Sequence, residues 1–113
     1  MKLLILGGDI RQLYMNRALQ KKGYRTALLL FNKQKPGDAP SLKEAFDDCD
    51  VLLLPLPVTR DGKTVNAPLC DTPFPLSAIS SLLPNNKLIL GGMIPFALHE
   101  QLAEKGIVHK DYY

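Results

Sequence analysis

The chain has 113 residues, 46% of them hydrophobic and 22% charged, and its 14 basic and 11 acidic side chains give a formal net charge of +3. This length fits one domain, residues 1–113, and is too short for both domains of a complete cofactor-dependent enzyme. Because the charges are scattered and the longest apolar runs are strand-sized, we expect no nucleic-acid partner and no membrane span. Two cysteines without a CxxC spacing favour a cytoplasmic protein with free thiols, and we expect no metal site.

The N-terminal part of the chain predicts a strand, a helix and a second strand. Residues 2–6 form an apolar run, typical of a buried parallel strand, which two adjacent glycines end. Asp9 is a suitable N-cap for the helix that follows, and Gly23 ends that helix before a strand over residues 25–31. The apolar residues at helical spacing that we expect to face the sheet are Ile10, Leu13, Tyr14 and Ala18.

The middle of the chain predicts a polar loop, a short helix and a third strand. Residues 32–40 hold two prolines and a glycine, which is typical of a loop. Ser41, with Glu44 three residues later, has the pattern of a capping box at the start of a helix. Residues 50–54 then predict a strand, which the following prolines end.

The last part of the chain predicts a β-hairpin and two further helix–strand pairs. Asp61-Gly62, flanked by β-branched residues, predicts a hairpin insertion over residues 58–69 that projects from the carboxyl end of the third strand. The remaining predicted elements are a helix over 76–83, a strand over 87–90, a helix over 95–105 and a strand over 107–109.

Strands that alternate with helices predict a parallel sheet made of βαβ units. We therefore predict a three-layer α/β domain of the flavodoxin-like or Rossmann-like kind, with about five parallel strands and helices on both faces. The flavodoxin-like strand order 2-1-3-4-5 is expected, although the sequence alone does not determine the order.

Ligands of such sheets bind beyond the carboxyl ends of the strands. The loops expected at that edge are residues 7–11, 55–66 and 91–94. The first of them lacks the Gly-x-Gly-x-x-Gly fingerprint, and Asp9 lies where a dinucleotide pyrophosphate would sit. We therefore expect no cofactor on this domain, with one alternative left open, an NADP site in which Lys33 and Lys35 hold the 2′-phosphate.

Several residues of these loops are candidates for substrate binding. Asp9 is explained by helix capping alone, whereas Arg11 lies in the first helical turn, where a cation opposes the macrodipole. Arg11 could pair with Asp9, or it could present its guanidinium to a substrate carboxylate beside backbone N–H groups. Thr59 is the candidate ligand near the third strand, and the turn at Gly92 offers further N–H groups to an anion. Arg60 is interpreted as ordinary hairpin surface.

No catalytic set is predicted, so the catalytic residues stay unknown. His99 lies in the middle of a helix, on a face that we expect to be solvated, and His109 lies near the end of the chain. The acidic cluster of residues 47–50 lies at the amino end of the sheet, which is the wrong edge for a ligand.

Three parts of the sequence resemble one known family. They are the run Leu3 to Gln12 with its Gly-Gly-Asp-x-Arg-Gln turn, the proline-ended third strand with its Asp-Gly-Lys turn, and Gly91-Gly92 before a helix. Together, in this order, they resemble the N-terminal domain of the dipicolinate synthase A-subunit. By this resemblance, Gly8, Asp9, Arg11, Thr59 and Gly92 would face an interdomain cleft and bind a small dicarboxylate substrate.

The resemblance also implies a function and a set of partners. The family's chain combines a flavodoxin-like N-terminal domain with a C-terminal Rossmann domain that binds NADP, and the second domain would lie beyond Tyr113. The enzyme oxidises a dihydrodipicolinate-type intermediate to dipicolinate in the mother cell of a spore-forming bacterium. Its partner is a second, flavoprotein-like subunit.

Two functions from different classes therefore remain. The chain is either the substrate-side domain of an NADP-dependent oxidoreductase or a stand-alone flavodoxin-like module that binds a nucleotide or a protein partner. Receiver-like signalling is a weaker third option, since it needs an acidic cluster at the carboxyl edge that Asp9 alone does not make. A homo-oligomer is compatible with each of these functions.

Overall fold

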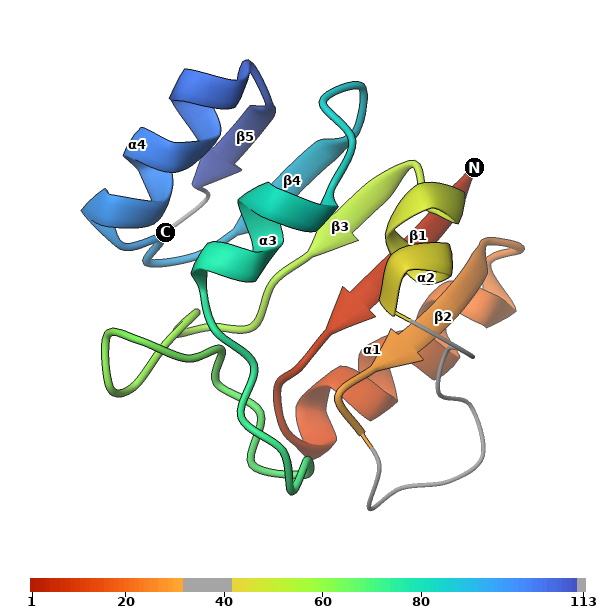
Figure 1. Cartoon of the computed structure of the whole chain (residues 1–113). Coiled ribbons are helices and arrows are strands. Elements are labelled where there is room, and N and C mark those ends of the chain that lie inside the picture. The colour runs from red at the N-terminus through yellow and green to blue at the C-terminus, as the bar shows by residue number, and fades with distance from the viewer. Residues whose placement is uncertain (32–41, 112–113) are drawn as a thin grey trace.

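The sheet has five parallel strands in the order β2-β1-β3-β4-β5 (Figure 1). The computed structural model describes residues 1–31 and 42–111. The elements are β1 (Lys2–Leu6), α1 (Ile10–Lys21), β2 (Arg25–Leu29), α2 (Leu42–Asp48), β3 (Val51–Leu53), α3 (Ser77–Leu82), β4 (Leu88–Gly91), α4 (Phe96–Lys105) and β5 (Val108–Asp111). The predicted α/β architecture and strand order are confirmed. The predicted capping box at Ser41 and the alternative NADP site at Lys33 and Lys35 lie outside the described residues.

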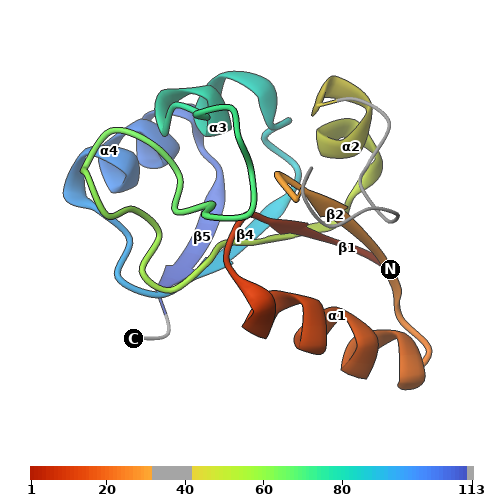
Figure 2. The ribbon, with the colours of Figure 1, turned by 90° about the horizontal axis from the view of Figure 1, so that it is seen from below.

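Helices cover the two faces of the sheet unequally. Figure 2 shows α1 alone on one face and α2, α3 and α4 on the other. Right-handed crossovers explain this, because the chain moves outward in one direction from β1 to β2 and in the opposite direction from β3 to β5. Among the described residues, none of the helices has the length and apolar composition that crossing a membrane requires.

The core has two parts, one on each side of the sheet. Strand residues alternate between the faces, so Leu4 and Leu52 point to the α2–α3–α4 side, whereas Ile5 points to the α1 side. The larger part contains Phe46, whose ring packs edge-to-face on Phe74 with 6.2 Å between the ring centroids. The larger part therefore joins three helices, the sheet and the long loop that leads to α3.

The predicted sheet-facing side of α1 is wrong for three of its four residues. Ile10 and Tyr14 are 56% and 59% exposed, and Ala18 is exposed as well. The side chains that pack against Ile5, Leu28 and Phe31 on this face are instead Leu13, Met15 and Leu19. Apolar residues lie on both sides of this helix, so periodicity did not identify the buried side. The start of the helix at Asp9 was predicted correctly, since Asp9 and Gln12 form a complete capping box, but a cap does not specify which side of a helix is buried.

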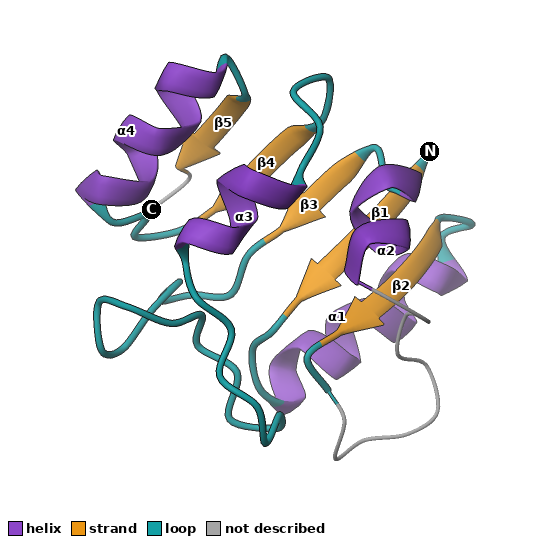
Figure 3. Cartoon of the chain, viewed as in Figure 1, coloured by secondary structure: helices purple, strands orange, loops and turns teal. Residues whose placement is uncertain are grey.

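The predicted β-hairpin over residues 58–69 is not formed by strands (Figure 3). The chain does reverse there, since the Asn66 N–H donates to the Val58 carbonyl at 2.8 Å. The antiparallel bridge of this loop, however, joins Thr64 to Pro75. The Asp61 carboxylate takes up the N–H groups of residues 63 and 64 at 2.8 Å each, so these groups are not available for a ladder with residues 58–60.

We expect Asp61 to make the stability of the protein sensitive to acid. Hydrogen bonds from the Thr64 and Lys63 backbone hold the pKa of the Asp61 carboxyl well below its usual range. A group with a depressed pKa in the folded state stabilises the fold above its ordinary value of about 4, and this contribution is lost as the pH falls further. Urea unfolding at pH 7 and pH 3 should therefore show a smaller pH difference for Asp61→Asn than for the unchanged protein.

A matched control for this experiment is Glu104→Gln on the exposed side of α4. It should keep the pH dependence of the unchanged protein. An Asp61→Asn variant with an unaltered pH dependence would contradict the role that we give to this carboxylate.

Candidate functional site

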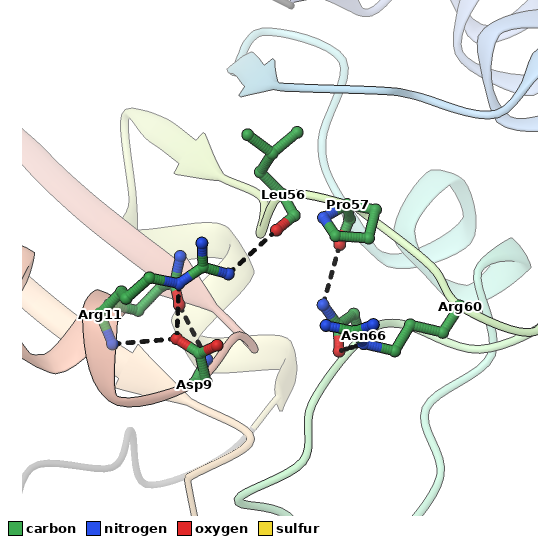
Figure 4. Close-up of polar contacts among 7 residues, drawn as sticks. Asp9, Arg11, Leu56, Pro57, Arg60 and Asn66 are labelled. Atoms are coloured by element: carbon green, nitrogen blue, oxygen red, sulfur yellow. Dashed lines mark hydrogen bonds and ion pairs between the residues drawn. The ribbon is translucent and has the colours of Figure 1, made fainter.

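The loops after β1 and β3 are joined at the carboxyl edge of the sheet (Figure 4). The Gly8 N–H donates to the Asn66 carbonyl at 2.7 Å, and Arg11 Nη2 donates to the Leu56 carbonyl at 3.2 Å. Gly7 makes the close approach possible, because a Cβ there would lie 2.9 Å from the Asn66 carbonyl oxygen. The two loops therefore form one continuous polar edge.

Asp9 is first of all the cap of α1. Its Oδ1 accepts the Arg11 N–H at 2.9 Å, while its own N–H donates to Gln12 Oε1 at 2.7 Å. The same Oδ1 accepts Arg11 Nε at 3.0 Å. These hydrogen bonds, the one from the Arg11 side chain above all, hold the pKa of the Asp9 carboxyl below its usual range. Asp9 is therefore an ionised carboxylate that holds a guanidinium in place.

Arg11 forms the predicted local ion pair and keeps part of its guanidinium exposed. Its Nε pairs with Asp9, so the local ion pair is formed. Its side chain is still 61% exposed, and Nη2 reaches across to the Leu56 carbonyl. Nη1 donates no hydrogen bond to the described residues. Its two N–H groups therefore remain available on a guanidinium plane that the other two nitrogens hold in place. The guanidinium is thus oriented by the protein and open on one side.

A second guanidinium lies on the same edge, at Arg60. Its Nε donates to Asn66 Oδ1 at 3.2 Å, and Asn66 Nδ2 donates to the Pro57 carbonyl at 3.1 Å (Figure 4). Asn66 is only 7% exposed, so its amide is a fixed link between the two sides of the loop. The positive charge of Arg60 also contributes, after the larger effect of Arg11, to the lowered pKa of Asp9.

Arg60 and Asn66 are two further functional candidates at this edge. The hairpin interpretation made Arg60 ordinary surface, whereas the loop turns it back onto Asn66. A cavity of about 320 Å³ lies beside them, lined by Thr64, Val65 and Cys70 among others. The sequence feature that could have indicated these contacts is Asn66. It is a polar residue between Val65 and Ala67, and a buried polar side chain needs hydrogen-bond partners.

Thr59 lies near this edge, but its hydroxyl is used within the loop. It donates to Asp61 Oδ1 at 3.1 Å and accepts the Gly62 N–H at 3.0 Å. The N–H of Gly8 is likewise used by Asn66. Neither group is therefore a ready donor for a ligand in this conformation, although both positions border the polar edge.

The turn at Gly92 is buried, and a carboxylate of the protein itself occupies the N–H groups that follow it. Met93 and Ile94 donate to the two oxygens of Asp111 at 3.2 and 2.9 Å. The strand register places Asp111 there, because Gly91 of β4 pairs with Asp111 of β5. The N–H groups of this turn, which were predicted to be available to an anion, thus bind the Asp111 carboxylate.

His99 is half-buried rather than on a solvated face, and it contacts His109. His99 Nδ1 lies 3.0 Å from His109 Nε2, and His109 Nδ1 lies 2.9 Å from the Ile107 carbonyl. Because a carbonyl only accepts, His109 Nδ1 carries the proton, and His99 donates to His109 Nε2 when His109 is neutral. These histidines join α4 to β5 and have no hydrogen bond or ion pair with Arg11.

A second cavity, of about 460 Å³, lies at the amino end of the sheet. It is lined by Lys2, Cys49 and the acidic residues of α2, among others. Burial raises the pKa of the Cys49 thiol, which keeps it protonated and unreactive. Among the described residues, no group of three metal-ligating side chains could hold a metal ion. The carboxyl edge, with its two guanidiniums, is therefore the candidate site.

The turn after β1 does not fit a dinucleotide. The Gly7 N–H donates to the Leu29 carbonyl at 2.9 Å, and the Gly8 N–H donates to Asn66, so neither is free for a phosphate. The ionised Asp9 carboxylate at the start of α1 would repel one. The described residues of this turn hold no phosphate cradle.

Comparison with known proteins gives a consistent result. The family model of the dipicolinate synthase A-subunit N-terminal domain matches residues 2–113. Two solved structures of similar fold are the dipicolinate synthase A chain from Bacillus subtilis (TM-score 0.77, 20% identity) and the dipicolinate synthase A-subunit from Bacillus halodurans (TM-score 0.78, 19% identity).

These matches cover 98% and 97% of the present chain, but the chain spans only 39% of the length of either solved protein. Among curated proteins, none matches. The family match over almost the entire sequence shows that the chain belongs to the family of N-terminal domains of the dipicolinate synthase A-subunit.

Proposed function

We propose that this chain is the substrate-side domain of an NADP-dependent oxidoreductase that converts a dihydrodipicolinate-type intermediate to dipicolinate. Its family membership and its fold support this proposal. NADP would be held by a C-terminal Rossmann domain, since the turn after β1 does not fit a dinucleotide. The same membership leads us to propose a flavoprotein-like partner protein, the second subunit of the synthase, and a place in the mother cell of a sporulating bacterium.

The observation that carries the proposal is the oriented guanidinium of Arg11. Its Nε is held by Asp9 and its Nη2 by Leu56, which reduces the entropy lost when a ligand binds. A pyridine dicarboxylate has two negative charges in a plane, and guanidinium groups bind carboxylates through paired hydrogen bonds. Arg60 supplies the second positive charge on the same edge.

We expect Arg11→Ala to weaken dipicolinate binding by at least about tenfold, which corresponds to roughly 1.4 kcal/mol. Arg11→Lys should fall in between, since a lysine keeps the charge but loses the planar donors. Isothermal titration of dipicolinate into the full polypeptide that contains this domain measures both effects.

Arg17→Ala is the matched control, because Arg17 lies on α1 with its guanidinium 5.9 Å from the centre of the Tyr14 ring and outside the polar edge. Its affinity for dipicolinate should equal that of the unchanged protein. If Arg11→Ala binds dipicolinate as tightly as Arg17→Ala does, Arg11 is not a carboxylate ligand. A reading frame that ends at Tyr113 would favour the stand-alone binding module instead.

A further inference from the structure

Asn66 is a buried polar residue that joins separate segments at the carboxyl edge of the sheet. Its carbonyl accepts the Gly8 N–H at 2.7 Å, and its own N–H donates to the Val58 carbonyl at 2.8 Å. Its side-chain Nδ2 donates to the Pro57 carbonyl at 3.1 Å, and its Oδ1 accepts Arg60 Nε at 3.2 Å. The place of the Arg60 guanidinium relative to the turn after β1 is therefore set through Asn66.

The two side-chain hydrogen bonds of Asn66 require an uncharged amide. A guanidinium only donates and a carbonyl only accepts, so the side chain at position 66 must offer one acceptor to Arg60 and one donor to Pro57. An aspartate would turn an oxygen toward the Pro57 carbonyl, and an apolar residue would leave both partners unpaired. Asparagine satisfies both partners and adds no charge to this edge.

The guanidiniums of Arg11 and Arg60 consequently differ in how their charges are balanced. Arg11 Nε lies 3.0 Å from the Asp9 carboxylate, so an anion of the protein compensates its charge. Arg60 is held by a neutral amide, and it forms none of the ion pairs among the residues that the structure describes. The neighbouring Asp61 carboxylate accepts backbone N–H groups of its own loop. Arg60 thus brings a positive charge that the protein does not balance.

Two adjacent carbonyls anchor both guanidiniums to the segment after β3. The Leu56 carbonyl accepts Arg11 Nη2, and the Pro57 carbonyl accepts the Asn66 amide that holds Arg60. Figure 4 shows Arg11 on one side of this segment and Arg60 with Asn66 on the other. The Arg60 side chain is exposed, and neither of its Nη groups donates a hydrogen bond to the described residues. These donors are therefore open to a ligand that Arg11 already holds.

We propose that Arg60, held by Asn66, selects a ligand with two carboxylates over a ligand with one. The inference rests on the proposed function, in which Arg11 binds a carboxylate of the substrate. The second carboxylate balances the charge of Arg60 and accepts charge-assisted hydrogen bonds from its Nη groups. Asn66 is a positioning residue, because it fixes this guanidinium through Nε without neutralising it.

Titration of two ligands into the full polypeptide that contains this domain tests the proposal. The ligands are dipicolinate and picolinate, which is the same pyridine with one carboxylate. The unchanged protein should bind dipicolinate at least about tenfold more tightly than picolinate. Arg60→Ala should reduce this preference to less than about threefold by weakening dipicolinate alone. Asn66→Asp should do the same at pH 7, because an ionised carboxylate at position 66 balances Arg60 in place of the ligand.

Asn86→Asp is the matched control, because it makes the same change of charge at an exposed residue before β4, at the amino edge of the sheet. Its preference for dipicolinate should equal that of the unchanged protein.

Equal binding of the two ligands by the unchanged protein would overturn the proposal. So would a preference that survives in Arg60→Ala or in Asn66→Asp, or an equal loss of both ligands in Asn66→Asp, which is the sign of a purely structural role. Arg60 is exposed, so Arg60→Ala decides the matter even where Asn66→Asp does not fold. Arg11→Ala should weaken both ligands, so unaltered binding in that variant marks failure of the proposed function and is distinguishable from failure here.

Discussion

Gly7→Ala is expected to lower the free energy of unfolding by about 3 kcal/mol, from left-handed backbone strain and from overpacking together. Gly7 has φ +69°, a conformation that L-residues rarely adopt. A Cβ there would also lie 2.9 Å from the Asn66 carbonyl oxygen and 2.9 Å from Val65 Cγ1. Both neighbours belong to the loop that carries Arg60, so the added methyl group would push the two halves of the candidate site apart.

Gly106→Ala separates these two causes. Gly106 has a similar φ of +77°, but nothing lies within 4 Å of the position of its Cβ. This variant should therefore cost only the backbone strain, about 1 kcal/mol. Urea unfolding of both variants measures the difference. Equal losses for Gly7→Ala and Gly106→Ala would show that the approach of the two loops at Gly7 is not a tight one.

Phe46→Ala is expected to cost about 3–5 kcal/mol of stability, the usual range for a large buried aromatic side chain. Phe46 has no exposed surface, and its ring forms a T-shaped pair with Phe74, with an interplanar angle of 65°. Phe74 in turn lies in the loop that leads to α3, where its carbonyl accepts the Val65 N–H at 2.9 Å. The substitution should thus loosen the loop of Arg60 as well as the core.

Phe96→Ala is the control for this substitution, since Phe96 is 76% exposed at the start of α4. It should change the free energy of unfolding by less than about 0.5 kcal/mol. Thermal or urea unfolding of the two variants gives the comparison. A loss at Phe46 no larger than the loss at Phe96 would mean that α2 does not pack on the sheet in the way described.

Local sequence patterns were sufficient to predict the fold class. Apolar runs of strand length alternate with helical patterns, and this alternation predicts the parallel sheet that is observed. Asp9 as the cap of α1 and Gly106 as the end of α4 were both predictable, because capping depends on residues within one turn of each other. The observed ends of β5 differ from the predicted ones by one or two residues, which is usual for short strands.

Local patterns do not predict contacts between residues that lie far apart in the chain. Asp61-Gly62 has the composition of a hairpin turn. In the structure, however, the Asp61 carboxylate accepts the Thr64 N–H and the Val65 N–H donates to the Phe74 carbonyl, so residues 64 and 65 do not pair with residues 58–60. Asp111 reaches the start of α4 only because β5 pairs with β4 in one register.

Interactions between near neighbours in the sequence specify the alternation of strands and helices, the helix caps and the turns at Gly7-Gly8 and Gly91-Gly92. The fold is needed to bring the Arg11 guanidinium to the Leu56 carbonyl and the Arg60 guanidinium to the Asn66 side chain. These features depend on groups that lie far apart in the chain, which come together only when the sheet has formed.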